Sequence, residues 1–395
     1  MRKNDHRVCE NMVSTPPSTT PPIQTEKDHM KIAILGIRGI PANYGGFETF
    51  AEQLAPRLAE RGHDVTVYGR RGAVTWPELH YKGVRLVILP TIHTKHLDTP
   101  VHTMVSTLHA LTQNYDAVLV CNAANAAFVW PLRLVGTRVL LNVDGIERLR
   151  KKWGRAGRAW YWLSEFLATK IPSAIVSDAG VIQEYYREKW HAESTMIPYG
   201  ADTARPDGTE ALQTYGVEPR RYLLVVARLE PENNIDMVVR AFARVQTDMR
   251  LVVVGDTPFD NDYKTQLHEL AARDPRVVMT GFLYGPPCRE LQANCYCYVH
   301  AADVGGTSPA LLEAMALGGY VIVGGTAQNL EVIDGLGLSF EPGSEDSLVE
   351  RIQYAIDHQD EADAARAPMH ERIETVYSWN AIADAYEALL SGDSA

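Results

Sequence analysis

The chain has 395 residues, a length that suits two domains better than a single core. Hydrophobic residues make up 46% of it and charged residues 22%, as in ordinary globular proteins. A net charge of -11 argues against broad binding of nucleic acid, because a phosphate backbone requires a basic surface. The five cysteines form no C-x-x-C pair, so we expect neither a disulfide framework nor a zinc site, and a cytoplasmic location fits best.

The first 29 residues are polar and rich in proline, which predicts a disordered leader over residues 1–29. They contain no apolar core of a secretory signal, and no stretch of the chain reaches the roughly 20 apolar residues of a membrane span. Met30 directly precedes the first predicted strand, so translation could start there as well as at Met1.

From residue 30 onward, strands alternate with helices. Residues 31–36 form a buried-strand pattern, and a glycine-rich loop leads to a helix with apolar residues at the 3.6-residue period, ending at Gly62. The next strand covers residues 65–68, and this order is typical of a doubly wound sheet. Further strands are expected at 84–89, 117–121, 139–143, 174–177 and 195–197, and helices at 101–112, 123–134, 159–170 and 179–189.

A polar stretch over residues 198–221 is interpreted as a linker, after which the pattern begins again. Strands are expected at 222–227, 251–255, 277–280, 295–299, 320–323 and 338–340, and helices at 235–245 (capped by Asn234), 263–273, 286–294, 309–317 and from 345 onward. The prediction is therefore an α/β protein with two doubly wound, Rossmann-like domains, over residues 30–200 and 201–375. Ligands of such sheets bind beyond the carboxyl ends of the strands, which places the site in the cleft between the domains.

The stretch from Ala302 to Met315 is the strongest candidate for a binding element. Gly305 and Gly306 allow a sharp turn, Ser308 is a favourable N-cap, and Pro309 suits the first helical position. A helix start of this kind presents free N–H groups to a phosphate. Glu313 interrupts an apolar helix and needs a polar partner such as ribose hydroxyls, although an ordinary buried helix with one exposed glutamate explains the pattern equally well.

Arg228, at the end of the strand that opens the second domain, could bind phosphate oxygens with its fork of donors, or could be a surface residue before a helix. The first glycine loop lacks the G-x-G-x-x-G pattern, and the second strand ends at Arg70 and Arg71 without an acidic residue. A nicotinamide site is therefore disfavoured, and an NADP-dependent oxidoreductase is kept as a minor alternative.

Several stretches together resemble a known family. GGFETFAEQLAPRLAERGHDVTVYGR, RLEPENNID and GGTSPALLEAMALGGYVIV are similar to the retaining glycosyltransferases of family 4, which have the two-domain GT-B fold. The longer stretches GIRGIPANYGGFETF, NVDGIERLRKKWG and GGTSPALLEAM resemble a branch associated with rhamnosyl transfer to cell-surface polysaccharides. The resemblance extends from Met30 to about Tyr386.

The resemblance implies transfer of a sugar from a nucleotide diphosphate donor to a glycan or a lipid-linked acceptor. The favoured donor is dTDP-rhamnose, followed by a UDP-hexose. The family retains the anomeric configuration and usually needs no metal, so neither a metal nor another cofactor is expected. The resemblance also implies that the C-terminal helix within residues 376–395 crosses back to the first domain.

Carried over residue by residue, the resemblance assigns Glu313 to the ribose and Arg228 to the diphosphate, and Asp144 and Glu147 are candidates to orient the acceptor. The other implied donor-binding residues are Gly45 and Gly46 at the phosphates and sugar, Gly281 and Phe282 at the base, and Gly306, Thr307, Ser308 and Pro309 at the distal phosphate.

The sequence also departs from the family pattern. The lysine that contacts the diphosphate falls at Asn233, and the first of two paired glutamates falls at Gly305, which leaves Asp303 as the nearest acid. The usual histidine after the fifth strand is replaced near Asp144. Another cation such as Arg38 could compensate for the missing lysine. These departures keep a second hypothesis open, a catalytically weak or inactive partner protein with the same fold.

Residues 148–162 interleave arginine and lysine with tryptophan and tyrosine. On an acidic protein, such a stretch indicates contact with anionic lipid or a lipid-linked diphosphate, and hence peripheral attachment to the inner membrane face. The alternative is a solvated loop followed by an amphipathic helix that packs its tryptophans inward.

Overall fold

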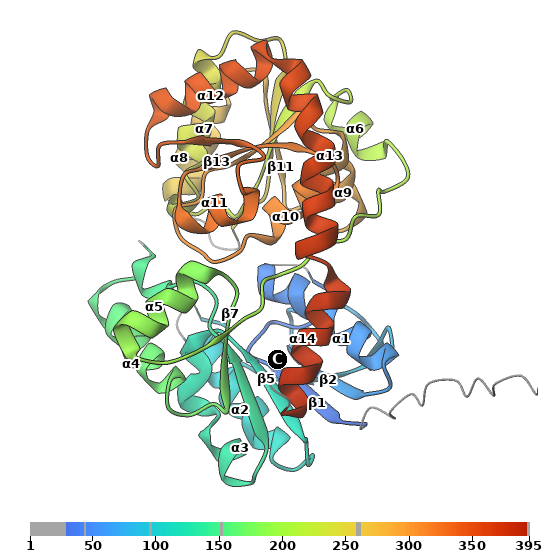
Figure 1. Ribbon diagram of the computed structural model, residues 1–395, viewed down its shortest axis with the longest axis vertical. Coiled ribbons are helices and arrows are strands. Elements are labelled where there is room, and N and C mark those ends of the chain that lie inside the picture. Colours follow the sequence, from blue (N-terminus) through green and yellow to red (C-terminus); the bar gives the residue numbers. More distant parts are fainter. Residues whose placement is uncertain (1–28, 43–44, 95–96, 151–152, 258–261, 393–395) are drawn as a thin grey trace, which may run out of the picture.

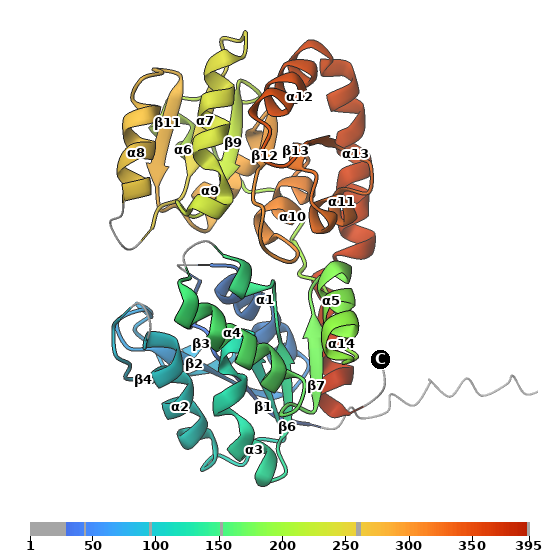
Figure 2. The ribbon, with the colours of Figure 1, turned by 90° about the vertical axis from the view of Figure 1, so that its left-hand side faces the viewer.

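The computed structural model describes residues 29–42, 45–94, 97–150, 153–257 and 262–392. Two α/β domains lie end to end, each built on a sheet with helices on both faces (Figures 1 and 2). This confirms the predicted fold class. The leader (except His29), Lys151 and Lys152 lie outside the described residues.

The sheet of the first domain has the strand order β3-β4-β2-β1-β5-β6-β7-β8, and among the described residues β3 is its only antiparallel strand. Its strands are β1 (Lys31–Leu35), β2 (Asp64–Arg70), β3 (His80–Tyr81), β4 (Val84–Leu89), β5 (Ala117–Cys121), β6 (Arg138–Asn142), β7 (Ala174–Ser177) and β8 (Thr195–Met196). Its helices are α1 (Gly46–Glu60), α2 (Asp98–Ala110), η1 (Ala123–Phe128), α3 (Trp130–Leu134), η2 (Glu147–Leu149), α4 (Arg155–Ala168) and α5 (Gly180–Trp190).

The sheet of the second domain has the order β11-β10-β9-β12-β13-β14, and its described pairings are all parallel. Its strands are β9 (Tyr222–Val226), β10 (Arg250–Val254), β11 (Val277–Gly281), β12 (Cys297–His300), β13 (Tyr320–Gly324) and β14 (Leu338–Phe340). Its helices are α6 (Glu210–Tyr215), η3 (Pro231–Asn233), α7 (Ile235–Arg244), α8 (Asp262–Ala271), α9 (Pro286–Asn294), α10 (Pro309–Ala316), α11 (Ala327–Ile333), α12 (Glu345–Asp357) and α13 (Gln359–Val376).

Three local predictions need correction. The expected linker contains helix α6, because Ala211 and Leu212 bury against α9 and the Leu212 N–H donates to Glu290 Oε1 at 3.0 Å. The helix expected over 123–134 is divided into η1 and α3. Asn234 occupies the predicted N-cap position of α7, but with a φ of 51° its side chain makes no capping bond, and its amide donates to the Ala301 carbonyl at 2.9 Å. The predicted cap at Ser308 is confirmed, since its hydroxyl accepts from the Leu311 N–H at 3.4 Å.

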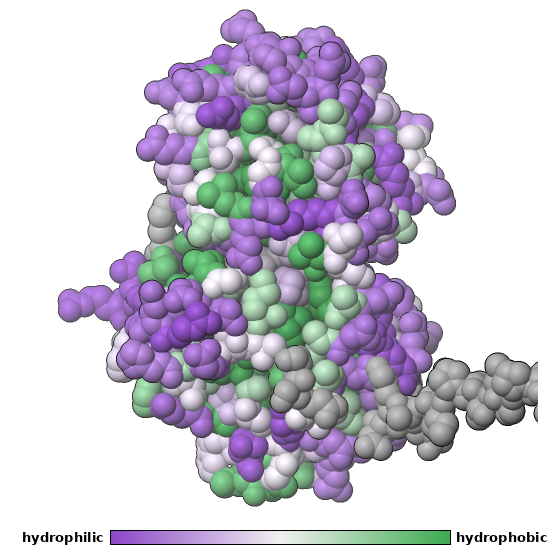
Figure 3. Space-filling model, viewed as in Figure 1, coloured by the Kyte–Doolittle hydropathy of each residue, from purple (hydrophilic) through white to green (hydrophobic). Residues whose placement is uncertain are grey.

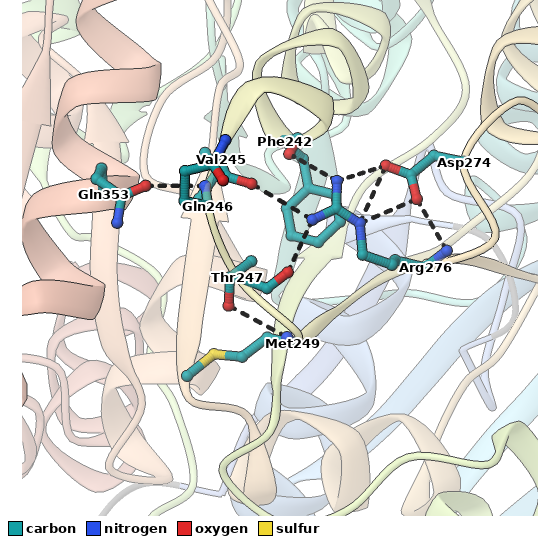
Figure 4. Close-up of polar contacts among 8 residues, drawn as sticks. All are labelled: Phe242, Val245, Gln246, Thr247, Met249, Asp274, Arg276 and Gln353. Carbon is teal, nitrogen blue, oxygen red and sulfur yellow. Dashed lines mark hydrogen bonds and ion pairs between the residues drawn. The ribbon is translucent and has the colours of Figure 1, made fainter.

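Arg276 fixes the end of α7 against β11. Its guanidinium pairs with Asp274 at 2.7 Å and donates to the carbonyls of Val245 and Thr247, just beyond the helix (Figure 4). Free carbonyls at a helix end carry partial negative charge, so the cation both pairs them and complements the helix dipole. This contact therefore ties the segment after α7 to the residue that precedes β11.

Helix α14 (Trp379–Ser391) joins the two domains. The chain leaves the second domain beside its entry point, where the Ala201 N–H donates to the Tyr377 carbonyl at 3.1 Å. Helix α14 then packs against α1 of the first domain (Figure 1). Its buried Tyr386 accepts a hydrogen bond from the Asn142 side chain at 2.8 Å. The last helix therefore belongs to the first domain, not to the second.

Hydrophobic and hydrophilic residues are unevenly distributed over the outer surface. On the face drawn in Figure 3, hydrophobic residues gather around the waist between the domains, and the far end of the second domain is mainly hydrophilic. Further hydrophobic residues lie across the middle of the second domain and at the lower end of the first domain in this view.

Docking of α14 is expected to depend on Glu387. Its side chain is only 7% exposed and pairs with Arg61 at 2.7 Å and His63 at 3.1 Å. Glu387→Ala removes the buried acceptor of both contacts and leaves Arg61 with only the exposed Asp384, so it should lower the free energy of unfolding by roughly 3 kcal/mol in urea denaturation. Asp384→Ala is the matched control, because Asp384 also pairs with Arg61 but is 65% exposed, and it should cost less than about 1 kcal/mol. Equal effects of the two variants would contradict this account.

Candidate active site

A cavity of about 790 Å³ lies between the domains. Loops after the strands of both sheets form its walls, as expected for facing parallel sheets. Acidic and basic side chains from both domains line it.

The second-domain wall carries Arg228, Asn233 and Glu313. Arg228 follows β9, and the Asn233 side-chain amide donates to its backbone carbonyl at 2.7 Å. Asn233 therefore fixes the backbone at Arg228 and adds no charge. Burial raises the pKa of Glu313, and the charge of Arg289 opposes this shift. Glu313 is a carboxyl group held in an enclosed place, where hydroxyl donors of a ligand would stabilise its ionised form.

The glycine turn before α10 also lines the cavity, but it is already partly engaged. The Thr307 N–H donates to Asp178 Oδ2 at 2.9 Å, and the Thr307 hydroxyl donates to the Asp178 carbonyl. This amide was expected to approach a phosphate, and the structure gives it a protein acceptor instead. Within the described part of the chain, no protein group accepts from the N–H of Gly305, Gly306 or Ser308, so these donors remain for an anion.

The first-domain wall brings Gly45 and Gly46 opposite α10. A Cβ added at Gly46 would lie 3.4 Å from Pro309 Cγ, so this loop reaches the turn across the cleft. The loop is held by Glu48, whose carboxylate accepts from the Arg38 N–H at 2.9 Å. The close approach explains why small residues occupy this position.

Asp144 and Glu147 lie farther along the same wall, after β6. Asp144 has a φ of 54°, a strained value for a residue with a side chain, and its N–H donates to Asn142 Oδ1 at 3.0 Å. Burial raises the pKa of Asp144, Arg150 opposes the shift, and Glu147 adds to it. Backbone strain and a perturbed pKa together are typical of functional positions.

Arg150 forms a buried ionic bridge between the domains. Its guanidinium pairs with Glu147 at 2.5 Å and with Glu232 of the second domain at 3.3 Å. Burial by itself would lower the pKa of Arg150, but Glu147, Asp144 and Glu232 together raise it. Glu232 is fully buried, so the bridge ties η3 to the first domain with little competition from water.

The structure collects most of the predicted site residues around the cavity. Those on its wall are Gly45, Gly46, Asp144, Glu147, Arg228, Asn233, Phe282, Gly305, Gly306, Thr307, Ser308, Pro309 and Glu313. Gly281 and Asp303 do not line it. The Gly281 carbonyl accepts from the Gly255 N–H, and the Asp303 N–H donates to the Glu232 carbonyl. At the cavity wall, the ring of Phe282 stacks on that of Tyr284, with the ring centroids 6.1 Å apart.

Sequence reasoning missed Asp178, Arg289 and Glu232. Asp178 follows the end of β7, and polar residues at the carboxyl ends of parallel strands are a usable signal. Glu232 offered no signal, because the sequence around it is polar and its burial depends on Arg150 of the other domain. Arg289 lies on α9, and its charge opposes the effect of burial, which raises the pKa of Glu313. The sequence does not show this interaction, because only the folded chain brings the two side chains together.

Two family models match the chain in succession. Residues 210–372 match glycosyl transferases group 1, and residues 29–202 match a domain of unknown function, DUF1972. A curated relative is the GDP-mannose-dependent alpha-(1-6)-phosphatidylinositol monomannoside mannosyltransferase of Mycolicibacterium smegmatis. It is 27% identical over 76% of this chain and 83% of its own.

Solved structures show the same architecture. Sucrose-phosphate synthase from Thermosynechococcus elongatus superposes with a TM-score of 0.79 at 18% identity, over 92% of this chain and all of its own. Anabaena HepE in complex with UDP-glucose superposes with a TM-score of 0.74 at 18% identity, over 92% of this chain and all of its own. The fold is therefore GT-B, and the family and sequence matches support a glycosyltransferase that uses a nucleotide-sugar donor.

Two absences hold for the described residues alone. None of their helices has the length and apolarity needed to cross a bilayer. They also contain no group of three or more histidine, cysteine, aspartate or glutamate side chains placed to hold a metal ion.

The contact between Gly306 and Asp178 gives a direct test of the closed cleft. A Cβ at Gly306 would overlap the Asp178 carboxylate, so Gly306→Ala should separate the turn from the first domain. We expect a lower thermal unfolding midpoint and weaker binding of nucleotide in a thermal-shift titration. Gly154→Ala is the control, because a Cβ there meets nothing within 4 Å and should leave both quantities unchanged. If Gly306→Ala left both the unfolding midpoint and the binding of nucleotide unchanged, the contact between Gly306 and Asp178 would not be needed for the closed cleft.

Proposed function

We propose that the protein transfers a sugar, with rhamnose as the first candidate, from a dTDP- or UDP-linked donor to a glycan or lipid-linked acceptor in the synthesis of a surface polysaccharide. The transfer retains the anomeric configuration and needs no metal. The observation that carries the proposal is the interdomain cavity in which Arg228, the glycine turn and Glu313 share one wall.

The reaction breaks a sugar–phosphate bond and leaves a diphosphate. The main task of the protein is to stabilise the negative charge that develops on this leaving group. Arg228 and the N–H groups of Gly305, Gly306 and Ser308 provide fixed donors for it. Such preorganised donors lower the barrier because they need no reorientation as the charge develops.

The acceptor would enter from the first-domain wall. Asp144 and Glu147 lie there, and an oxygen of the leaving phosphate can take the acceptor's proton on the face that the acceptor attacks. No protein nucleophile is then required. The contacts of Arg150 and Asp178 across the cleft keep the domains together, which excludes water that would otherwise hydrolyse the donor.

The donor assignment is tested by binding and turnover. We expect thermal stabilisation by dTDP or UDP, and transfer from the matching sugar nucleotide to a polyprenyl-diphosphate glycan. Arg228→Ala and Glu313→Ala should each reduce transfer at least tenfold, because each removes a charged contact to the donor. Arg273→Ala, on the opposite side of the second domain near Glu345, serves as the surface control.

The outcomes separate the alternatives. Binding without turnover would identify an inactive partner protein, and stabilisation by NADP alone would identify an oxidoreductase. Full transfer activity in both site variants would contradict the site assignment.

We also propose that α4 rests on an anionic membrane surface. Its inner face buries Tyr161, Ser164, Glu165 and Ala168, and its outer face exposes Trp162, Leu163 and Phe166 beside Arg155, Arg158 and Lys170. Trp162 is 50% exposed, and its ring is tilted by 55° against that of Trp190, with the ring centroids 5.5 Å apart. Apolar and basic groups on one helix face fit the boundary of an anionic bilayer. Because Trp153 and Tyr161 line the cavity, this surface adjoins the site.

Flotation with vesicles tests this surface. The native protein should float with vesicles that contain anionic phosphatidylglycerol and not with purely zwitterionic vesicles. Trp162→Ser combined with Phe166→Ser should abolish flotation, whereas Tyr354→Ser, an exposed aromatic on α12, should not. Flotation of the double variant equal to that of the native protein would refute the proposal.

A further inference from the structure

A fully buried aspartate joins the two domains at the cavity. Asp178 follows β7 in the first domain, and its side chain has no exposed surface. Its carboxylate and its carbonyl both accept from Thr307 of the second domain. Its second carboxylate oxygen, Oδ1, has no hydrogen-bond partner. A buried carboxylate with an unpaired oxygen is costly unless it carries a proton or gains a partner.

A second carboxyl group faces the same place. Asp144 follows β6, the strand beside β7, and lines the cavity. Burial raises the pKa of Asp178 well above that of an ordinary aspartate, and the charge of Asp144 raises it further. Two neighbouring carboxyl groups in an enclosed site resist double ionisation and titrate as a pair.

The cation beside this pair is shared with other carboxylates. Arg150 is the cation that faces Asp144, and its guanidinium is already bound by Glu147 and Glu232. The remaining titratable neighbours are Cys121, Tyr199 and Tyr386, whose pKa values burial raises, with further contributions from these carboxyls. They are neutral at ordinary pH and bring no positive charge.

The backbone around the pair is tightly fitted. A Cβ on Gly145 would lie 2.8 Å from Gly305 Cα, and a Cβ on Gly306 would overlap the Asp178 carboxylate. Asp144 is held by Asn142, which is in turn bound to Tyr386 of α14. The Asp178 carboxyl therefore cannot move without disturbing the domain contact, and the backbone that carries Asp144 is fixed beside it.

We propose that Asp178 is a positioning residue that shares one proton with Asp144 and, in this state, holds the Gly305–Thr307 turn in place between donor and acceptor. The inference rests on the proposed function, because it places Asp144 beside the acceptor. Protonation of the pair relieves the repulsion between its members and leaves Asp178 Oδ2 as an acceptor for Thr307.

The sign of the pH dependence follows from the retained proton. The folded pair keeps a proton that an unfolded aspartate, with a pKa of ~3.9, has released at neutral pH. The folded form is therefore favoured at low pH, and its advantage is lost as the pH rises through the raised pKa. Between the pKa of the unfolded aspartate and the raised pKa of the folded pair, one retained proton changes the unfolding equilibrium constant about tenfold per pH unit.

Infrared spectroscopy and pH-dependent unfolding test the proposal without any donor or acceptor. At pH 7 the native protein should show the carbonyl stretch of a protonated carboxylic acid, and Asp178→Asn should lose it. The asparagine keeps an oxygen for the Thr307 N–H, so the variant should fold. Its thermal midpoint relative to the native protein should rise between pH 5 and pH 8, because it lacks the destabilising ionisation.

Glu331→Ala is the matched control. The Glu331 carboxylate accepts from the Gly180 N–H at 3.0 Å, so its loss also removes a cross-domain contact but leaves the aspartate pair intact. This variant should keep the infrared band and the native pH dependence. If the control shifted the pH dependence as strongly as Asp178→Asn, loosening of the domains would explain both and the proposal would fail.

Absence of the acid band in the native protein, or identical pH dependence in Asp178→Asn, would overturn the proposal. Should Asp178→Asn fail to fold, the native spectrum and that of Asp144→Asn, which should also lose the band, decide the matter. The pH profile of transfer is the second readout, and Asp178→Asn should flatten its alkaline limb. If no sugar nucleotide supports transfer, the proposed function fails. The infrared and unfolding data still decide whether Asp178 and Asp144 share a proton.

Discussion

The arrangement of the two domains depends on polar contacts buried between them. Arg150 reaches Glu232, Asp178 reaches Thr307, and Glu331 reaches Gly180, all close to the cavity. Such contacts are strongly directional in an enclosed site and lose their value when the partners separate by a few ångströms. They therefore define one closed arrangement of the cleft, and the apolar packing of α14 on the first domain secures the chain that connects the two lobes.

The same contacts shape the chemistry of the site. The second-domain wall presents Arg228 and the amides of the glycine turn, and Glu313 lies on the same wall. The first-domain wall presents Asp144 and Glu147 beside Arg150. The local donors of the second-domain wall would let a chain with a net charge of -11 hold an anionic ligand.

The asparagine at position 233 has a local role in the structure. Asn233 binds the carbonyl of Arg228 and closes η3 against the strand end, so the position has a structural use without a charge. Next to it, Glu232 draws Arg150 across the cleft. Arg150 of the first domain thus reaches the neighbour of Asn233, and it is bound there by the carboxylates of Glu147 and Glu232.

The sequence alone determined the two doubly wound sheets, the Ser308 cap and some of the residues on the cavity wall, because apolar periodicity, glycine turns and strand ends are local properties. It could not determine which polar residues face each other across the cleft. The place of Asp178 after β7 does not reveal its partner Thr307, Glu232 stands in an ordinary polar stretch, and α6 arises where a linker was expected because α9 covers its apolar side. Burial and pairing of charges depend on residues more than 80 positions away, so only the tertiary structure decided them.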